Sequence, residues 1–427
     1  MDVNEPVESS DQGVAREDAG AGLGSLLRIA DFRRLWICDG LMFQGLWMEG
    51  LVVGWLVLEM TDSPFWVAMV DFCRAIPIPF AGLFGPVLTD RFQRRRVILA
   101  LQTLNALALI TVAVLYWSDG LKYWHLAAAA AVGGIAWGLD WPNRRAVIPD
   151  LVGKSRVVDG MLLGNGMQAF ARVSGPLLGG VALAAVGVGG ALVIMVAMAV
   201  LSVLVLTTIR SEARSPDVPR GISSSLSRVA EGLRYVRGQR VILGIVAVTV
   251  IMNVWAFPYQ SLLPVFARDV LGRGPLGLGL LTCASGLGSF LGLLLVTRYR
   301  HDPRRVRIFA GGSVLCCLGL VGFASCDYFP LAVLMLLVVG VGQAGFSSMQ
   351  STILLMEAPD HIRNRVMGTL VCAIGMGPFG RIQAGSLATL SGAPVAVAAM
   401  AGFAVVAMCV AIILLPGFVR PRPISSR

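Results

Sequence analysis

The most regular feature of the sequence is a series of long apolar runs separated by shorter polar segments. A helix needs about 20 mainly apolar residues to cross a hydrocarbon core of about 30 Å. Twelve runs reach roughly that length, at residues 35–58, 64–88, 97–117, 124–147, 160–184, 188–209, 241–266, 275–297, 306–325, 329–355, 366–390 and 393–415. The pattern predicts an all-α membrane protein with twelve transmembrane helices.

The longest interruption, residues 210–240, divides these runs into two sets of six. It is first rich in Ser and Pro and then places Leu226, Val229, Leu233 and Val236 at helical spacing. We expect a cytoplasmic linker with an amphipathic surface helix. The predicted organisation is a disordered tail (1–27), two six-helix bundles (28–209 and 241–415) around a central cavity, and a short tail (416–427). Such paired halves are typical of secondary transporters.

Composition supports a membrane protein. The chain is 56% hydrophobic and 14% charged, whereas a soluble domain is about 25% charged, and the mean hydropathy is +0.76. The net charge of +10 could suggest nucleic acid, but the basic residues form short clusters between apolar runs and no single binding patch. The eight cysteines lie in apolar runs without metal or disulfide spacing. We therefore expect no nucleic acid, no metal and no cofactor.

The distribution of basic residues predicts the orientation, because basic loops stay on the cytoplasmic side. If both termini are cytoplasmic, most of the 35 Lys and Arg residues fall in the termini and inner loops. The exceptions are Lys122, Arg268 and Arg273 in outer loops, and Arg74, Arg172 and Arg381 within spans. Only Lys122 and Lys154 are lysines, which suggests a GC-rich bacterial genome, and we expect a multi-pass protein of the bacterial inner membrane.

Seven ionisable residues fall within predicted spans: Asp39, Glu49, Asp71, Arg74, Asp140, Arg172 and Arg381. A charge at bilayer depth is costly, so such residues normally face a partner or a hydrated cavity. Asp71 and Arg74 share a helix face and form either a structural ion pair or part of a site. Glu49 has no basic residue one turn away, and burial favours its protonated form. We hypothesise that Glu49 couples protons with Arg74 or Arg172.

The loop after the second span carries a family resemblance. Its Asp90, Arg91, Phe92, Gln93, Arg94 and Arg95 resemble the signature between helices two and three of the major facilitator superfamily. The resemblance implies that Asp90, Arg91, Arg94 and Arg95 form a cytoplasmic charge cluster that locks the two halves. Pro86 and Gln93 stand where the family pattern has glycine.

The fifth span contains a second match, at Gly175, Pro176, Gly179 and Gly180, which resembles the helix-five motif of the family's exporters. Proline removes a helical hydrogen bond and glycines permit close contact, so a bend and a tight interface are expected here. Three further stretches, "FRRLW…GWLVLEMTDSP", "PNRRAVIPDLV" and "RNRVMGTL", resemble the branch that includes the bacterial enterobactin exporter. Together the resemblance covers nearly all of the chain from residue 28. The arginine that the family's drug and proton antiporters carry early in the fourth span is missing.

In this superfamily the first, fourth, seventh and tenth helices line the cavity, and polar stripes occur on these spans. Residues one and two turns apart share a face. The stripes are Gly133, Trp137 and Asp140; Asn253, Phe257 and Gln260; and Gln343, Ser347 and Gln350. The alternative is interhelical hydrogen bonding. With Trp47, Trp255 and Tyr259 they predict an aromatic, amide-rich site for an amphiphilic molecule, in which Arg172 and Arg381 could hold an anionic group.

The function that these patterns favour is export of a small amphiphilic molecule, such as a siderophore, drug or metabolite, by alternating access and proton antiport. The expected partners are the substrate, protons and the lipid bilayer, and a monomer is expected. An importer on the same fold, or a sensor or assembly factor that does not transport, are the alternatives. The sequence has no P-loop and no recognisable catalytic constellation, which argues against an ATPase or other enzyme.

Overall fold

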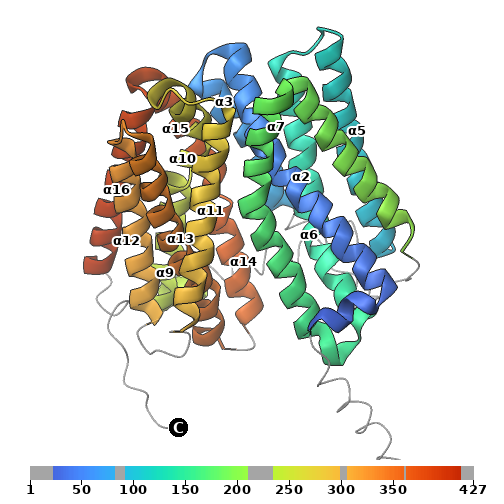
Figure 1. Cartoon of the computed structure of the whole chain (residues 1–427). Helices are drawn as coiled ribbons and strands as arrows, with labels where there is room; N and C mark the ends of the chain where they lie inside the picture. Colours follow the sequence, from blue (N-terminus) through green and yellow to red (C-terminus); the bar gives the residue numbers. More distant parts are fainter. Residues whose placement is uncertain (1–22, 82–91, 210–233, 299–304, 360–361, 415–427) are drawn as a thin grey trace, which may run out of the picture.

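The computed structural model describes residues 23–81, 92–209, 234–298, 305–359 and 362–414. Every regular element in these ranges is helical, and the helices form two bundles (Figure 1). The first bundle contains η1 (Leu23–Arg28), α2 (Ala30–Thr61), α3 (Pro64–Ala75), α5 (Arg94–Trp117), α6 (Tyr123–Val152), η2 (Lys154–Arg156) and α7 (Val157–Thr207). The second contains α9 (Arg240–Ile251), η3 (Met252–Ala256), α10 (Tyr259–Val265), η4 (Phe266–Val270), α11 (Pro275–Thr297), α12 (Arg305–Ala324), α13 (Phe329–Glu357), α14 (Arg363–Ile374), α15 (Gly377–Ser391) and α16 (Ala393–Leu414).

Several of these helices are interrupted where the sequence carries glycine or proline. α7 includes two predicted spans, and the break lies at Gly187 (φ 68°, ψ −176°), a conformation that glycine adopts without a side-chain clash. The seventh predicted span is divided into α9, η3, α10 and η4, with Pro258 and Pro264 in its course. Proline removes a backbone donor from the helical ladder. Pro378 likewise stands in the first turn of α15, just after α14 ends.

Nine helical runs within the described residues are long and apolar enough to cross a membrane. One of them is the broken run Val157–Thr207, whereas α6 and the pair α14–α15 are not among the nine. The all-α membrane fold is therefore confirmed. The count of twelve, the orientation of the termini and the exact domain limits stay predictions. Residues 210–233 of the expected linker lie outside the described residues; beyond them, residues 234–238 are helical and Val236 is buried.

The two bundles contact each other chiefly through α7 with α11 and α3 with α15, and α10 also touches α2 and α3. In Figure 1 they meet at the upper end, near α3 and α15, and diverge towards the lower end. The upper end carries the turn between α2 and α3, which the charge distribution predicts to lie outside. This arrangement corresponds to a carrier closed at its predicted outer end.

Small residues allow the bundles to approach closely. A Cβ atom added to Gly180 of α7 would lie 2.8 Å from the carbonyl oxygen of Pro275 and 3.0 Å from Cα of Gly279. Within the first bundle, a Cβ on Gly175 would lie 2.7 Å from Cβ of Trp47 on α2. Lipid offers no hydrophobic drive between helices, so close packing of small residues is a main source of contact energy. The glycines of the helix-five motif thus provide the expected tight interface.

We predict that Gly180→Ala destabilises the protein by about 1–3 kcal/mol because the added methyl group meets backbone atoms of α11. Gly166→Ala is the matched control, since the same helix leaves open space around Gly166. Alanine there should be neutral or slightly stabilising. Thermal unfolding in detergent measures both, and equal effects of the two substitutions would contradict the inferred contact.

Candidate functional site

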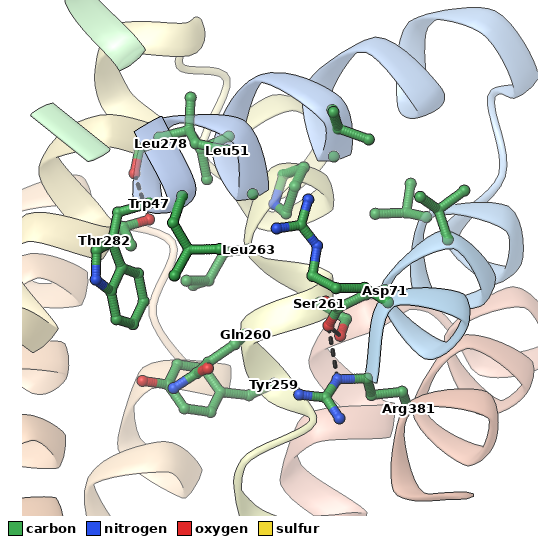
Figure 2. A pocket seen from close by; sticks show the side chains of 18 of the residues that line it. Trp47, Leu51, Asp71, Tyr259, Gln260, Ser261, Leu263, Leu278, Thr282 and Arg381 are labelled. Atoms are coloured by element: carbon green, nitrogen blue, oxygen red, sulfur yellow. Dashed lines mark hydrogen bonds and ion pairs between the residues drawn. The ribbon is translucent and has the colours of Figure 1, made fainter. Parts of the chain in front are cut away.

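A cavity of about 330 Å³ lies between the two bundles, and we call it the central cavity. Figure 2 shows part of its lining, with Trp47, Leu51 and Asp71 from the first bundle facing Tyr259, Gln260 and Arg381 from the second. Both halves therefore contribute to one cavity at their interface. This is where a carrier that alternates between two openings must hold its substrate.

An ion pair joins the halves at this cavity. Arg381 Nε of α15 lies 2.7 Å from Asp71 Oδ2 of α3, and Ser261 of α10 donates a short hydrogen bond to the same oxygen (Figure 2). The sequence places Asp71 beside Arg74, but Asp71 forms its ion pair with the other half. Nearer the predicted outer end, Arg268 pairs with Asp62 and also donates to the carbonyl of Leu58. These contacts hold the halves together at that end.

A second ion pair lies within the first half. Arg74 Nη2 of α3 lies 2.6 Å from Glu49 Oε1 of α2. Glu49 is 4% exposed, so its carboxyl group is almost removed from solvent. The third helix, α6, packs closely against α3 here, because an added Cβ on its Gly134 would lie 1.9 Å from the carbonyl oxygen of Arg74. The structure thus brings together Glu49 and Arg74, which were predicted to act together.

Arg172 of α7 lines the central cavity without such a partner. No hydrogen bond or ion pair of its guanidinium group occurs within the described part of the chain. Its guanidinium carbon lies 5.5 Å from the centre of the Trp47 ring, a cation–π distance. The indole Nε1 of Trp47 is also buried without a hydrogen-bond partner. The wall formed by Arg172 and Trp47 therefore has unused donors and an uncompensated positive charge.

The remaining polar lining is aromatic and neutral. Trp137 and Gln260, both predicted as substrate ligands, line the central cavity together with Tyr259 and Thr282. The Tyr259 hydroxyl shares a 3.0 Å hydrogen bond with the Ser285 hydroxyl. Flat rings beside a single amide suit an aromatic or amphiphilic molecule.

A much smaller cavity, of about 40 Å³, lies inside the first half, and we call it the bundle cavity. Its polar lining residues are Glu49, Gln102, Asn105 and Asp140. Glu49 lines this cavity and is not part of the central lining. Leu46, Gly133 and Trp137 line both and form the wall between them.

Asp140, predicted as a substrate ligand, lines the bundle cavity and belongs to a buried charge cluster. Arg144 Nε lies 2.6 Å from Asp140 Oδ2, and Arg144 Nη1 lies 2.5 Å from Asp39 Oδ1. The predicted orientation places Arg144 among the basic residues of the inner loops, but its side chain is buried within α6, where the residue is 3% exposed. Its four-residue spacing from Asp140 is the sequence signal that could have identified the pair.

Five other predicted substrate residues are absent from the central lining. Asn253 donates to the carbonyl of Thr249 at 2.9 Å, and Gln350 donates to the Thr249 hydroxyl at 2.5 Å. Phe257 packs edge-on against Phe346. Ser347 and Gln343 both belong to α13, and Gln343 is 9% exposed. Of the two hydrogen bonds to Thr249, the one from Gln350 joins two helices, as the interhelical alternative expects, whereas that of Asn253 lies within its own helical run. The role of all five residues in binding stays a prediction.

The predicted cytoplasmic gate is only partly described. Asp90 and Arg91 lie outside the described residues. Arg94 donates to the carbonyl of Ala146 at 2.8 Å, and Arg95 donates to the carbonyl of Thr207 at 2.7 Å. Both acceptors belong to the first half, so these arginines make contacts within their own bundle in this conformation.

The helix-five motif is described in full. Pro176 lies inside a helix whose break occurs eleven residues later, at Gly187. Gly175 and Gly179 face α2, where an added Cβ on Gly179 would lie 3.2 Å from Met48. The motif therefore supports close packing around Trp47 and the central cavity.

Comparison with known proteins identifies the family. The sequence profile of the transmembrane secretion effectors matches residues 23–421. The chain belongs to this family of major facilitator transporters. It is 28% identical to the multidrug efflux pump Tap of Mycobacterium tuberculosis over 352 residues, covering 79% of this chain and 82% of that protein. It is 25% identical to the enterobactin exporter EntS of Salmonella choleraesuis over 399 residues, covering 91% and 93%.

A solved structure supports the fold of this secretion-effector chain. A bacterial homologue of the lysosomal transporter Spinster, in an inward-facing and unoccupied conformation, aligns with a TM-score of 0.72 at 14% identity. The alignment covers 93% of this chain and 99% of that one. The protein is therefore a multi-pass membrane transporter with the major facilitator fold.

We predict that the Asp71–Arg381 pair couples the two halves energetically. Asp71→Asn and Arg381→Gln should each cost on the order of 1 kcal/mol, since both side chains are about one-third exposed and water screens them. The double variant should cost less than the sum of the two. A double-mutant cycle on thermal unfolding measures this. The pair Asp31 and Arg34 serves as the control, because its side chains are similarly exposed but both belong to α2. Strict additivity at Asp71 and Arg381 would contradict the coupling.

Proposed function

We propose that this protein exports a small amphiphilic organic molecule across the bacterial inner membrane in exchange for protons, and that the wall formed by Arg172 and Trp47 anchors the substrate. The observation that carries the proposal is the uncompensated guanidinium of Arg172 in a cavity built from both halves. The names of the relatives, a multidrug efflux pump and an enterobactin exporter, support export.

The charges around the central cavity favour an anionic or electron-rich substrate group. Asp71 and Arg381 neutralise each other, and Glu49 neutralises Arg74 from behind the cavity wall. Arg172 is left as the one extra charge among these five groups. Because an unpaired charge at bilayer depth is costly, an anionic ligand that pairs with Arg172 gains affinity. A catecholate or carboxylate siderophore would supply such a group beside an aromatic ring.

Alternating access would proceed by exchange of ion pairs at the two ends. In the present conformation Asp71–Arg381 and Asp62–Arg268 join the halves at the predicted outer end. Opening towards that side requires both pairs to separate. Asp90, Arg91, Arg94 and Arg95 are proposed to make the corresponding contacts at the cytoplasmic end in the alternate state. A monomer suffices for this cycle.

Glu49 is the proposed proton carrier. Protonation removes its negative charge and releases Arg74, which lines the central cavity. The cavity then contains two uncompensated guanidinium groups instead of one. A change of one charge in a confined site alters ligand affinity, because the effective dielectric constant there is lower than that of water.

For an anionic substrate, the same electrostatics favour a second candidate, an importer that moves its substrate together with protons, whereas proton antiport fits a substrate whose binding competes with protonation of Glu49. Protonating Glu49 makes the cavity more positive, so a proton and an anionic substrate would bind together, whereas a proton and a cation would compete. Reconstituted vesicles separate the candidates. An anionic carboxylate siderophore and cationic ethidium are the probes, and the sign of the imposed pH gradient that drives each gives the coupling. Movement of neither probe under any gradient would contradict both candidates and favour a protein that does not transport.

We predict that Arg172→Gln weakens binding of the anion salicylate about tenfold, which corresponds to about 1.4 kcal/mol. Neutral salicylamide should be little affected, because only the anion pairs with the guanidinium. Arg145→Gln is the matched control, since Arg145 also lies over a tryptophan, Trp141, at 4.0 Å but does not line the central cavity. Calorimetry in detergent measures the affinities. Equal losses for the anion and the amide would remove the anchoring role of Arg172.

We predict that Glu49→Gln abolishes the dependence of transport on the pH gradient, while substrate exchange in the absence of a gradient persists. Glutamine keeps the shape of the side chain and can still accept a hydrogen bond from Arg74, but it cannot carry a proton. Counterflow of labelled substrate in vesicles measures exchange, and gradient-driven uptake measures coupling. Unchanged gradient-driven transport by Glu49→Gln would assign the proton to another group.

A further inference from the structure

The bundle cavity places the proposed proton carrier in a compartment separate from the substrate. Glu49 lines the bundle cavity, and Arg74 stands between its carboxyl group and the central cavity. An added Cβ on Gly133 would lie 3.3 Å from Asn105 Oδ1 and 3.7 Å from Glu49 Oε1. Glu49 and Asn105 therefore approach each other across this glycine, on the side of the bundle away from the substrate.

Hydrogen bonds continue this polar row towards the predicted cytoplasmic end. Gln102 donates to Asp140 Oδ2 at 2.7 Å, and Arg144 bridges Asp140 to Asp39. Glu49 and Asp39 are ten residues apart on α2, which corresponds to about 15 Å along a helix axis. The row therefore extends over roughly half of a hydrocarbon core of about 30 Å.

One oxygen in the row has no hydrogen-bond partner among the residues that the structure describes. Asp140 Oδ1 is buried without a hydrogen bond, in a residue that is 1% exposed and lines the bundle cavity. Leaving a buried acceptor unsatisfied is costly. A cavity of 40 Å³ has room for about two water molecules, and its four polar residues supply the partners that such waters need.

The charges of the cluster leave a place for one proton. Asp39 and Asp140 carry two negative charges against the single positive charge of Arg144. The other polar groups that contact the cluster or line the same cavity are Cys38 and Glu49 from α2, Gln102 and Asn105 from α5, and Ser202 from α7. Glu49 in turn contacts Arg74 of α3. Arg74 is already paired with Glu49, so none of these groups neutralises the excess negative charge. A proton on Asp140 Oδ1 would neutralise it.

We propose that the bundle cavity holds water and that Glu49 exchanges its proton with Asp140 through this water, separately from the central cavity. The inference rests on the proton coupling proposed above. A proton leaves Asp140 Oδ1 for a cavity water, which passes one of its own protons to Glu49. Asp140 is left as a carboxylate held by Gln102 and Arg144, the water is restored, and Arg74 is released towards the substrate.

Radiolytic footprinting tests the water. Hydroxyl radicals formed from water in the cavity should oxidise Met195, which lines the bundle cavity and is 1% exposed. Met48 is the internal control, because it is equally buried and lines neither cavity. We expect mass spectrometry to find oxidation of Met195 above that of Met48. Equal protection of both residues would show that the cavity is dry and would overturn the proposal.

Infrared spectroscopy of the solubilised protein tests the route. The carbonyl band of protonated Glu49 is the band that Glu49→Gln removes, and its deuterium exchange reports access to solvent. Ala199→Leu fills the bundle cavity and should slow this exchange roughly 100-fold, the scale of losing a positioned proton-transfer group. Ala197→Leu, two residues earlier on an exposed face of α7, should leave the rate unchanged. Thr282→Trp fills the central cavity and should also leave it unchanged.

Slower exchange in Thr282→Trp and not in Ala199→Leu would show that Glu49 exchanges protons through the central cavity, and the proposal would be wrong. The absence of any band that depends on Glu49 would also overturn it. These measurements need no substrate, so they are independent of whether the protein transports.

Asp140→Asn connects the relay with transport. This variant should lose gradient-driven transport but retain exchange of labelled substrate in the absence of a gradient. Full coupling in Asp140→Asn would reject the relay and leave the exporter proposal intact.

Discussion

The cost of a charge at bilayer depth is the constraint that organises this structure. Each ionisable group within the membrane either finds an opposite charge or faces a cavity. The partners determine what each charge does. Asp71–Arg381 crosses between the halves, Glu49–Arg74 lies within one half, and Asp39–Arg144–Asp140 lies buried inside a single bundle. Arg172 stands apart from these pairs on the wall of the central cavity.

This distribution assigns two tasks of a coupled transporter, control of the conformation and response to protons, to different ion pairs. Pairs between the halves can break only when the halves move, so they report and control the conformation. In the proposed cycle, the pair within the first half changes without movement of the helices, because protonation of Glu49 breaks it. Arg74 connects the two kinds of event, since it binds Glu49 and also faces the substrate space. In the proposed cycle, the tight glycine contacts between α7 and α11 would be the interface through which a local change of charge moves a whole bundle.

Much of the fold was predictable from sequence, because apolar run length and basic loops are strong local signals. The membrane character follows from them, whereas the glycine-rich contact on α7 was expected from its small residues and from the family resemblance. The partners in the ion pairs were harder to predict from the sequence. Asp71 and Arg74 are neighbours on one helix, yet Asp71 pairs with Arg381 and Arg74 pairs with Glu49, both on other helices. Helical periodicity placed Trp137, Asp140 and Gln260 on helix faces, but it did not predict which helix or cavity each face contacts. Asp140 faces the interior of its own bundle, and Gln343 and Gln350 pack within theirs, because helix rotation is decided by packing with neighbours.

The central claim is that charge pairs hold the predicted outer end closed and separate during transport. Pulsed electron resonance between spin labels at the exposed positions Asp119 and Leu390, one on each half, tests it most directly. In the unchanged protein the account predicts one dominant short distance. The double variant Asp62→Asn with Asp71→Asn should shift the population towards a longer second distance. A pair of labels at the predicted cytoplasmic end should shift towards a shorter distance. A single distance that the double variant leaves unchanged would contradict the account.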